Sequence, residues 1–243
     1  MSAGRPPFAN WPGWRHLQRT ALLGLLVAGW FALVYVGADW ITEQHAIRVR
    51  VHFAAELNLP FLPVFTLAYV SLYAAFAAVP FILRSRSEVR RLARDLALAI
   101  GVAGVCFVAL PACLAYPPPP ADLGLWTPLF RFADWANLDH NLLPSLHITL
   151  GVLCLESFAR QAAAPGRMVL RGWAGLIAAS TMLIHQHHLL DVIVGGLLAW
   201  GIRARHRSAG RGPGGHRADG RVGSKFSAHA DRHSACERSC LRL

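Results

Sequence analysis

Three long stretches without a charged residue constrain the fold of this chain more than any other feature. They are Thr20–Ala38, Leu57–Leu83 and Leu96–Ala121. A helix needs about 20 apolar residues to cross the roughly 30 Å of hydrocarbon in a bilayer, and each stretch supplies nearly that number or more. The tetraproline Pro117–Pro120 ends the third helix near Tyr116, because proline has no backbone N–H with which to continue it. The stretches predict three membrane-spanning helices.

The composition supports the same interpretation. Of the 243 residues, 54% are hydrophobic and only 15% are charged, whereas a soluble domain carries about a quarter charged residues. An ordinary soluble enzyme is therefore not expected. Three shorter apolar stretches follow at Leu143–Phe158, Met168–Ile184 and Leu189–Ile202. Together the six stretches predict an all-α integral membrane protein, a bundle of six transmembrane helices.

Arginine is distributed unevenly between the segments that connect these helices. With the N-terminus inside, the inner segments before the tail are Met1–Arg19, Arg84–Arg94 and Arg160–Arg171. The outer segments are Asp39–Pro60, Tyr116–Leu142 and His185–Leu190. The inner segments hold eleven Arg residues and the outer segments hold three. Because cytoplasmic loops carry an excess of Lys and Arg, we expect a multi-pass protein of the cell membrane with both termini in the cytoplasm.

Most of the net charge of +11 lies in the C-terminal part of the chain. Residues 203–243 hold ten of the 24 basic residues and a net charge of +7, and large apolar residues are scarce there. Such a composition is typical of a disordered tail. We therefore expect a cytoplasmic segment at 1–19, a transmembrane domain at 20–202 and a disordered basic tail at 203–243. A charge confined to a tail does not predict nucleic-acid binding.

Polar and ionisable residues cluster at two places where apolar residues are expected. The first cluster is Asn141–His147, and the second is Ser180–Gly196. An ionisable residue in a membrane span is costly and indicates a functional site. The six-span topology, which rests only on run lengths and Arg counts, places both clusters on the outer side. We therefore expect one site that faces outward.

The spacing within the clusters favours phosphoryl transfer. His187 and Asp191 are four residues apart, so on a helix they share a face, and the carboxylate can hold one imidazole nitrogen while the other attacks. His147 lies about one turn into its helix, with Pro144 as its first residue and Ser145 near its N-terminus. A helix N-terminus favours an anion such as phosphate. His187 is then the nucleophile, and His147 is the acid that protonates the leaving oxygen.

These residues resemble a known family. Pro144–His147 (Pro-Ser-Leu-His), followed by Ser180-Thr181, His187 and Asp191, is similar to the second and third motifs of the type 2 phosphatidic acid phosphatase superfamily. The closest similarity is to its inositol phosphorylceramide synthase-like and sphingomyelin synthase-like branch. The resemblance covers roughly residues 20–202. It implies a helical bundle and a metal-independent reaction on a lipid phosphate or phospholipid headgroup.

The resemblance also implies a role for each matching residue. His187 would form a phosphohistidine, Asp191 would orient it, His147 would act as acid and base, and Ser145, with Ser180 and Thr181, would hold the phosphate. Phosphatases of the superfamily have an Arg where this chain has Thr181, and a first motif with Lys and Arg-Pro. The segment Tyr116–Ala121 before the second motif contains neither Lys nor Arg. Arg131 is therefore the first candidate for a substrate-binding cation, followed by Arg48 and Arg50.

Several alternatives remain open from the sequence. Water as acceptor gives a phosphatase and an alcohol gives a transferase. A non-catalytic homologue that binds lipid or a partner protein is the second hypothesis, and a transporter ranks last because the charged residues cluster at one surface. A metal site from His185, His187, His188 and Asp191 is conceivable, but we expect neither metal nor cofactor. We interpret His140, His185 and His188 as interfacial residues, and Glu156 as the partner of Arg160.

Overall fold

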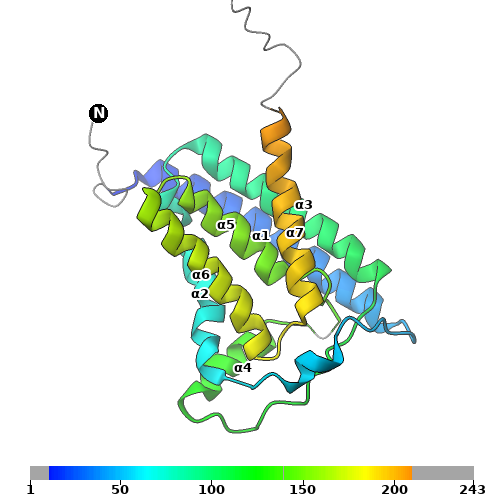
Figure 1. Ribbon diagram of the computed structural model, residues 1–243. Helices are drawn as coiled ribbons and strands as arrows, with labels where there is room; N and C mark the ends of the chain where they lie inside the picture. The colour runs from blue at the N-terminus through cyan, green and yellow to red at the C-terminus, as the bar shows by residue number, and fades with distance from the viewer. Residues whose placement is uncertain (1–10, 139, 210–243) are drawn as a thin grey trace, which may run out of the picture. The chain divides into compact units, whose positions relative to one another are not determined.

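The computed structural model describes residues 11–138 and 140–209, and it is all-helical over these residues (Figure 1). The α-helices are α1 (Trp14–Glu43), α2 (Thr66–Ile82), α3 (Arg86–Ala109), α4 (Thr127–Trp135), α5 (Leu146–Ala159), α6 (Ala164–Leu183) and α7 (Leu189–Ala209). Three short 3-10 helices are η1 (Ala54–Asn58), η2 (Pro63–Phe65) and η3 (Gly124–Trp126). Within the described ranges, the only β-type pairing is an isolated bridge between Val49 and Ala112. The all-α prediction is confirmed for this part of the chain.

Three helical segments in the described residues are long and apolar enough to cross a membrane. They are Trp14–Glu43, Pro63–Ile82 and Arg86–Ala109, with 30, 20 and 24 residues. Helix α5 is apolar but has only 14 residues. Helices α6 and α7 have 20 and 21 residues but do not meet the same test of hydropathy and charge. The structure therefore supports membrane spans for the first three predicted stretches, and the six-span arrangement stays a prediction.

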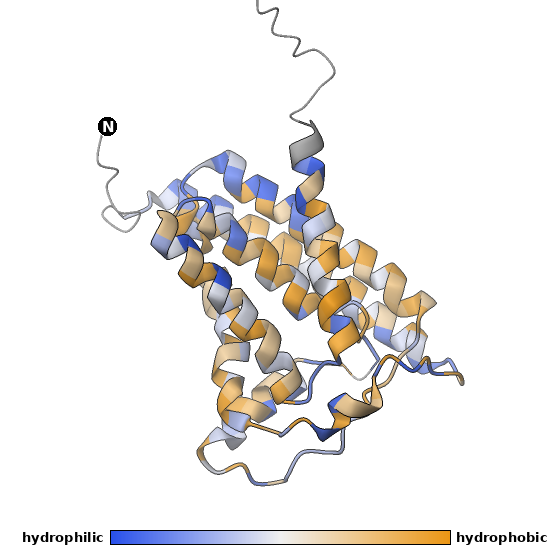
Figure 2. Ribbon diagram, in the orientation of Figure 1, coloured by the Kyte–Doolittle hydropathy of each residue, from blue (hydrophilic) through white to orange (hydrophobic). Residues whose placement is uncertain are grey.

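The outer surface of α1 is apolar. Leu22, Leu25, Leu26 and Leu33 are each more than half exposed, which a soluble protein seldom tolerates in a row along one helix. Figure 2 shows hydrophobic residues along most of the length of the helices, and hydrophilic residues gathered at the start of α3 and the end of α7. This distribution fits helices whose middle faces lipid.

Helix α3 begins earlier than its uncharged stretch predicts. Ser85 is its N-cap, and the Ser85 side chain accepts the Glu88 N–H (3.1 Å) while the Glu88 carboxylate accepts the Ser85 N–H (3.2 Å). This reciprocal capping box fixes the helix start, so the predicted inner segment Arg84–Arg94 is mostly helical. The helix ends at Ala109, not near Tyr116, because Pro111 disfavours helical geometry at Leu110.

Helix α7 also exceeds its predicted bounds. It continues through Ala209, so residues 203–209 belong to a helix and not to the predicted disordered tail. Ion pairs hold this part to the bundle. His206 Nε2 lies 2.8 Å from the Asp95 carboxylate, and the Arg203 guanidinium lies 3.0 Å from Glu156. The rest of the predicted tail, 210–243, and residues 1–10 lie outside the described residues.

Helix α5 lies in the centre of the bundle and packs on α2, α3, α6 and α7, whereas α1 packs mainly on α3. The core between α3 and α5 includes Ile100, Ala103, Phe107, Leu153 and Cys154, all at most 1% exposed. In Figure 1 the starts of α3 and α6 and the end of α7 lie at one end of the bundle. The starts of α5 and α7 and the end of α6 lie at the opposite end, which we call the site end.

Candidate functional site

His147 is the second residue of α5 and packs against α2. Its ring stacks on Tyr69, with centroids 3.7 Å apart and an angle of 11° between the rings. Its Nε2 lies 2.9 Å from the Tyr69 carbonyl oxygen. A carbonyl oxygen can only accept a hydrogen bond, so Nε2 carries the proton and donates it. The Nδ1 of His147 is therefore the nitrogen available for proton exchange.

A helix C-cap places His187. At the end of α6, the N–H of Gln186 donates to Thr181 O (2.8 Å) and the N–H of His185 donates to Met182 O (3.0 Å). His185 has a φ of 56°, and this left-handed residue completes a Schellman motif. The His187 N–H also donates to Thr181 O (3.1 Å). The loop thus fixes the backbone that carries the His187 side chain, and that side chain is 6% exposed.

Asp191 is brought to His187 by a helix start and not by a shared helical face. Helix α7 begins at Leu189, so His187 precedes it, and the predicted common face is wrong. His188 is the N-cap position, and its N–H donates to the Asp191 carboxylate (2.9 Å), which is one half of a capping box. The same carboxylate oxygen lies 3.6 Å from His187 Nδ1. This distance is longer than that of a hydrogen bond. The carboxylate therefore lies beside the imidazole without a direct hydrogen bond to it.

The two motifs meet at the site end. The Ser145 N–H donates to Asp191 O (3.0 Å), and the Thr149 hydroxyl donates to Gly195 O (3.0 Å). Ser145 is fully buried and is the N-cap of α5, where its hydroxyl accepts the Ile148 N–H. Pro144, expected inside the helix, precedes this cap. Segments 46 residues apart in the chain are thus joined by one backbone hydrogen bond and one hydrogen bond from a threonine hydroxyl.

His147 and His187 line the same cavity, as the sequence predicts. The cavity has a volume of about 380 Å³, and Tyr73, Asn137 and Asn141 line it beside the two histidines. The volume is in the range of small-molecule sites, about 300–1,000 Å³. Asn141 is 1% exposed, and its Oδ1 has no hydrogen-bond partner. Two imidazoles near the N-terminus of α5 form an arrangement that can bind an anion and exchange protons with it.

The other predicted substrate-binding residues do not line this cavity. The hydroxyls of Ser180 and Thr181 are buried and donate to Ile177 O and Ala178 O of their own helix. Arg131 is exposed on α4. No Arg or Lys of the described ranges is among the lining residues. The substrate-binding roles of Ser145, Ser180, Thr181 and Arg131 stay predictions.

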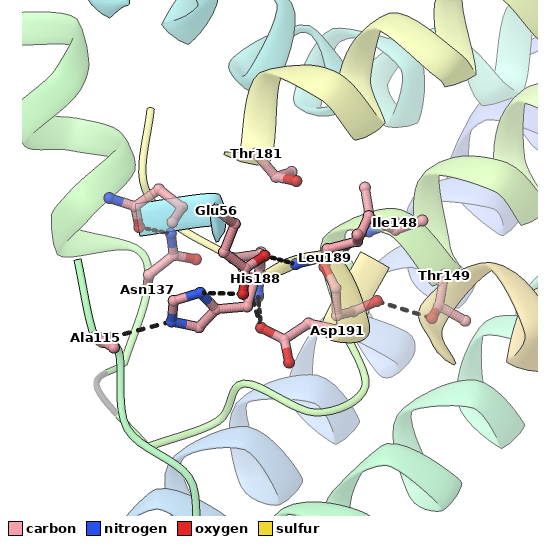
Figure 3. A network of polar contacts seen from close by, with 12 residues as sticks. Glu56, Ala115, Asn137, Ile148, Thr149, Thr181, His188, Leu189 and Asp191 are labelled. Atoms are coloured by element: carbon pink, nitrogen blue, oxygen red, sulfur yellow. Dashed lines mark hydrogen bonds and ion pairs between the residues drawn. The ribbon is translucent and has the colours of Figure 1, made fainter. Parts of the chain in front are cut away.

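A second polar cluster, which we call the Glu56 cluster, lies beside the site and was not expected from the sequence (Figure 3). Glu56 on η1 is 6% exposed, and its carboxylate accepts the N–H groups of Phe53 (2.7 Å) and Leu189 (2.8 Å). It also lies 3.3 Å from His188 Nδ1. The Ala115 N–H donates to His188 Nε2 (3.1 Å). His188 is therefore the neutral tautomer with its proton on Nδ1, facing Glu56.

Aromatic stacking completes the Glu56 cluster. Tyr116 stacks on His185 (4.1 Å, 7°) and on His188 (4.6 Å, 16°). His188 is fully buried and His185 is 7% exposed, so the interpretation of both as interfacial residues is wrong. Burial lowers the pKa of His188, and the nearby Asp191 and Glu56 carboxylates oppose that shift only in part. The only sequence signal for Glu56 is its position as a lone acid beside a long uncharged stretch.

The described residues contain no group of three or more His, Cys, Asp and Glu residues that could hold a metal ion. His140, the third histidine interpreted as interfacial, is paired with Asp39, with 3.2 Å between Nδ1 and Oδ1.

No model of a known protein family matches the chain, and no curated protein matches it.

Proposed function

We propose that this chain is a membrane phosphatase or phosphotransferase that acts on a lipid phosphate or phospholipid headgroup through a phosphohistidine. We also propose that it belongs to the type 2 phosphatidic acid phosphatase superfamily that its motifs resemble. The observation that carries the proposal is that His147 and His187, from two distant segments, line one cavity. Apolar helices next to that cavity support a lipid as the substrate.

The first chemical step forms a bond between His187 and phosphorus. Its Nδ1 faces the Asp191 carboxylate, so Nε2 is the nitrogen that attacks. As the N–P bond forms, the P–O bond to the leaving group breaks. The leaving oxygen takes the Nδ1 proton of His147, which enters this step as an imidazolium and keeps its Nε2 proton on Tyr69 O. Asp191 stabilises the positive charge that develops on the His187 ring. In the second step His147 Nδ1 removes a proton from the acceptor, whose oxygen attacks phosphorus and breaks the N–P bond.

The topology belongs to the same proposal. Six spans with both termini in the cytoplasm place the Arg-rich starts of α3 and α6 inside and the site end outside, in a cell membrane. The positive-inside rule supports this orientation. In Figure 1 the Arg-rich segments and the His187 loop lie at opposite ends of the bundle.

The test uses the purified full-length protein in detergent without added metal. We expect release of phosphate or exchange of headgroup from a panel of lipid phosphates, inhibited by vanadate, and an acid-labile phosphoprotein during turnover. His187→Ala abolishes both signals. His45→Ala, which replaces an exposed histidine just after α1, is the matched control and keeps full activity. Full activity of a folded His187→Ala protein contradicts the proposal.

A non-catalytic homologue that binds lipid or a partner is the second candidate. It is favoured by the lining of the cavity, which contains no Arg or Lys from the described residues to stabilise phosphoryl charge. The panel distinguishes the two candidates. Binding of lipid phosphates without phosphate release, headgroup exchange or phosphoprotein supports the second one.

A further inference from the structure

The cavity at the two histidines extends far beyond them into the bundle. Its walls come from α1, α2, α3 and α5, and it reaches Thr20 near the start of α1 and Val89 near the start of α3. On α1 the lining residues run from Thr20 to Tyr35, which corresponds to about 22 Å along the helix axis. The cavity therefore leads from the site end through most of the depth of the bundle.

Its polarity changes along this path. The polar residues His147, His187, Asn137 and Asn141 lie at the site end. Below them the lining is almost entirely apolar, with Leu23, Val27 and Phe31 on α1, Phe76 on α2, and Leu92 and Leu96 on α3. A ligand that fits both parts has a polar head and a long hydrocarbon body. Water gains little in the apolar part, because it finds few hydrogen-bond partners there.

The volume and length of the cavity fit a single hydrocarbon chain. A volume of about 380 Å³ spread over a length of about 22 Å gives a narrow channel. A helix, with a diameter of about 10–12 Å including side chains, does not fit into it. Gly24 and Ala28 line the channel and are themselves exposed, and a Cβ on Gly24 would meet no atom within 4 Å. The channel is therefore open sideways at this level, where a chain can enter from surrounding lipid.

We propose that this channel binds one hydrocarbon chain of the lipid substrate, inside the bundle between α1, α2, α3 and α5, while the phosphate lies between the two histidines. The inference rests on the proposed function and makes it more specific. The substrate is then a phosphate-bearing lipid with a long hydrocarbon chain, and this chain leaves the bilayer to enter the channel. A short-chain phosphate reaches the histidines without filling the channel.

The kinetic test compares two variants on α1. Ala28→Trp fills the channel, and Ala32→Trp, at an exposed position outside the lining, is the matched control. We expect Ala28→Trp to lower kcat/KM for a sixteen-carbon lipid phosphate by at least about tenfold, since loss of two buried methylene groups already changes affinity by about that factor. For a four-carbon analogue both variants retain wild-type kcat/KM within about twofold. An equal loss of kcat/KM on both substrates, or no loss on either, contradicts the proposal that the channel binds the hydrocarbon chain.

A second measurement does not depend on catalysis. A lipid phosphate with a diazirine at the end of its chain is bound to the wild-type protein and photolysed, and the labelled residues are mapped. We expect labels at Leu23, Val27 and Leu92, and their loss in Ala28→Trp. Labels confined to the outward residues Leu25 and Leu26 overturn the channel. If the wild type cleaves no lipid phosphate but the channel residues are labelled, the proposed enzymatic function is wrong. Binding of a hydrocarbon chain in the channel is then still supported.

Discussion

At the scale of single residues, Asp191 has two roles that substitutions can separate. Its carboxylate lies beside His187 Nδ1 (3.6 Å) and also accepts the N–H of His188, the N-cap of α7 (2.9 Å). Asparagine retains an oxygen that accepts the N–H but loses the charge. Alanine loses both and leaves a buried N–H without a partner.

We therefore expect Asp191→Asn and Asp191→Ala to lower kcat by a similar factor, roughly two to four orders of magnitude. Only Asp191→Ala should also lower the free energy of unfolding, by about 1–3 kcal/mol. Phosphate release and chemical denaturation measure the two effects. If Asp191→Asn has wild-type kcat, the charge does not act on His187 and the proposed mechanism is wrong.

His188 gives the fold a dependence on pH. Because burial lowers its pKa, the unfolded chain, with a pKa of about 6.5, binds the proton first as the pH falls. The stabilising contribution of neutral His188 is complete above the unfolded pKa and is lost as the pH falls below it. The charged and titratable groups around the ring are Glu56, Asp191, His52 and His187, together with Tyr116, which stacks on it.

We expect the melting temperature of the wild type to fall between about pH 7.5 and pH 5. His188→Gln, which keeps an acceptor for the Ala115 N–H, should show a smaller fall, measured by thermal unfolding in detergent. Some fall remains in the variant, because burial also lowers the pKa of His185. Equal falls in the two proteins would mean that another group controls the pH dependence.

The sequence predicts part of this site, for physical reasons that differ between residues. His147, His187 and Asp191 could be found because costly polar residues stand out against apolar neighbours. The geometry of His187 and Asp191 could not be predicted, because it depends on where α7 begins. The helix begins at Leu189, after His187. Glu56 and Tyr116 could not be found either. Their contacts with His188 join segments more than 70 residues apart, and no local spacing encodes them.

At the scale of elements, the start of α5 lies against α7 at a glycine. A Cβ added to Gly195 would lie 2.6 Å from Ser145 O, a backbone atom, whereas one added to Gly196 would meet no atom within 4 Å. The close approach holds the two motifs together through Thr149 and Gly195. Of the glycine pair 195–196, only the first is required by packing.

Gly195→Ala should therefore lower the free energy of unfolding by about 1–3 kcal/mol, because the backbone of α5 must move away. It should also lower activity, since Ser145 and the His147 cavity move with α5. Gly196→Ala is the matched control, and we expect it to be neutral or slightly stabilising because alanine favours helix over glycine. Denaturation of both variants under one condition is the measurement. Equal effects would show that the contact at Gly195 is relieved at no cost.

The lengths of the elements differ from the predicted ones for a common reason. Uncharged stretches locate apolar segments well, but capping and packing set where the helices begin and end. Helix α3 begins at a capping box among charged residues. Helix α7 passes Ile202 because Arg203 and His206 find acidic partners on α5 and α3. Glu156 pairs with Arg171 (2.8 Å) and Arg203 (3.0 Å), and the expected contact with Arg160 is replaced by these longer-range ones.

The proposed topology places the candidate site on the outer side of the membrane and the Arg-rich start of α3 on the inner side. The candidate site and the exposed Cys113 belong to segments at the site end, whereas the turn between α2 and α3 carries Arg84, and Arg86 begins α3 at the opposite end. If α3 spans the membrane, Cys113 and the N-terminal end of α3 lie on opposite sides. The positive-inside rule assigns the arginine side to the cytoplasm.

This sidedness can be measured with a membrane-impermeant maleimide. In intact cells we expect labelling of a variant whose only cysteine is Cys113. A variant whose only cysteine is introduced by Ser87→Cys, at an exposed position in the first turn of α3, should be labelled only after the membrane is permeabilised. The reversed pattern would place the histidines in the cytoplasm, where they meet a different pool of lipid phosphates. Labelling of both variants in intact cells would mean that α3 does not cross the membrane. That result would contradict the proposed topology, in which the site lies at the outer end of a membrane-spanning bundle.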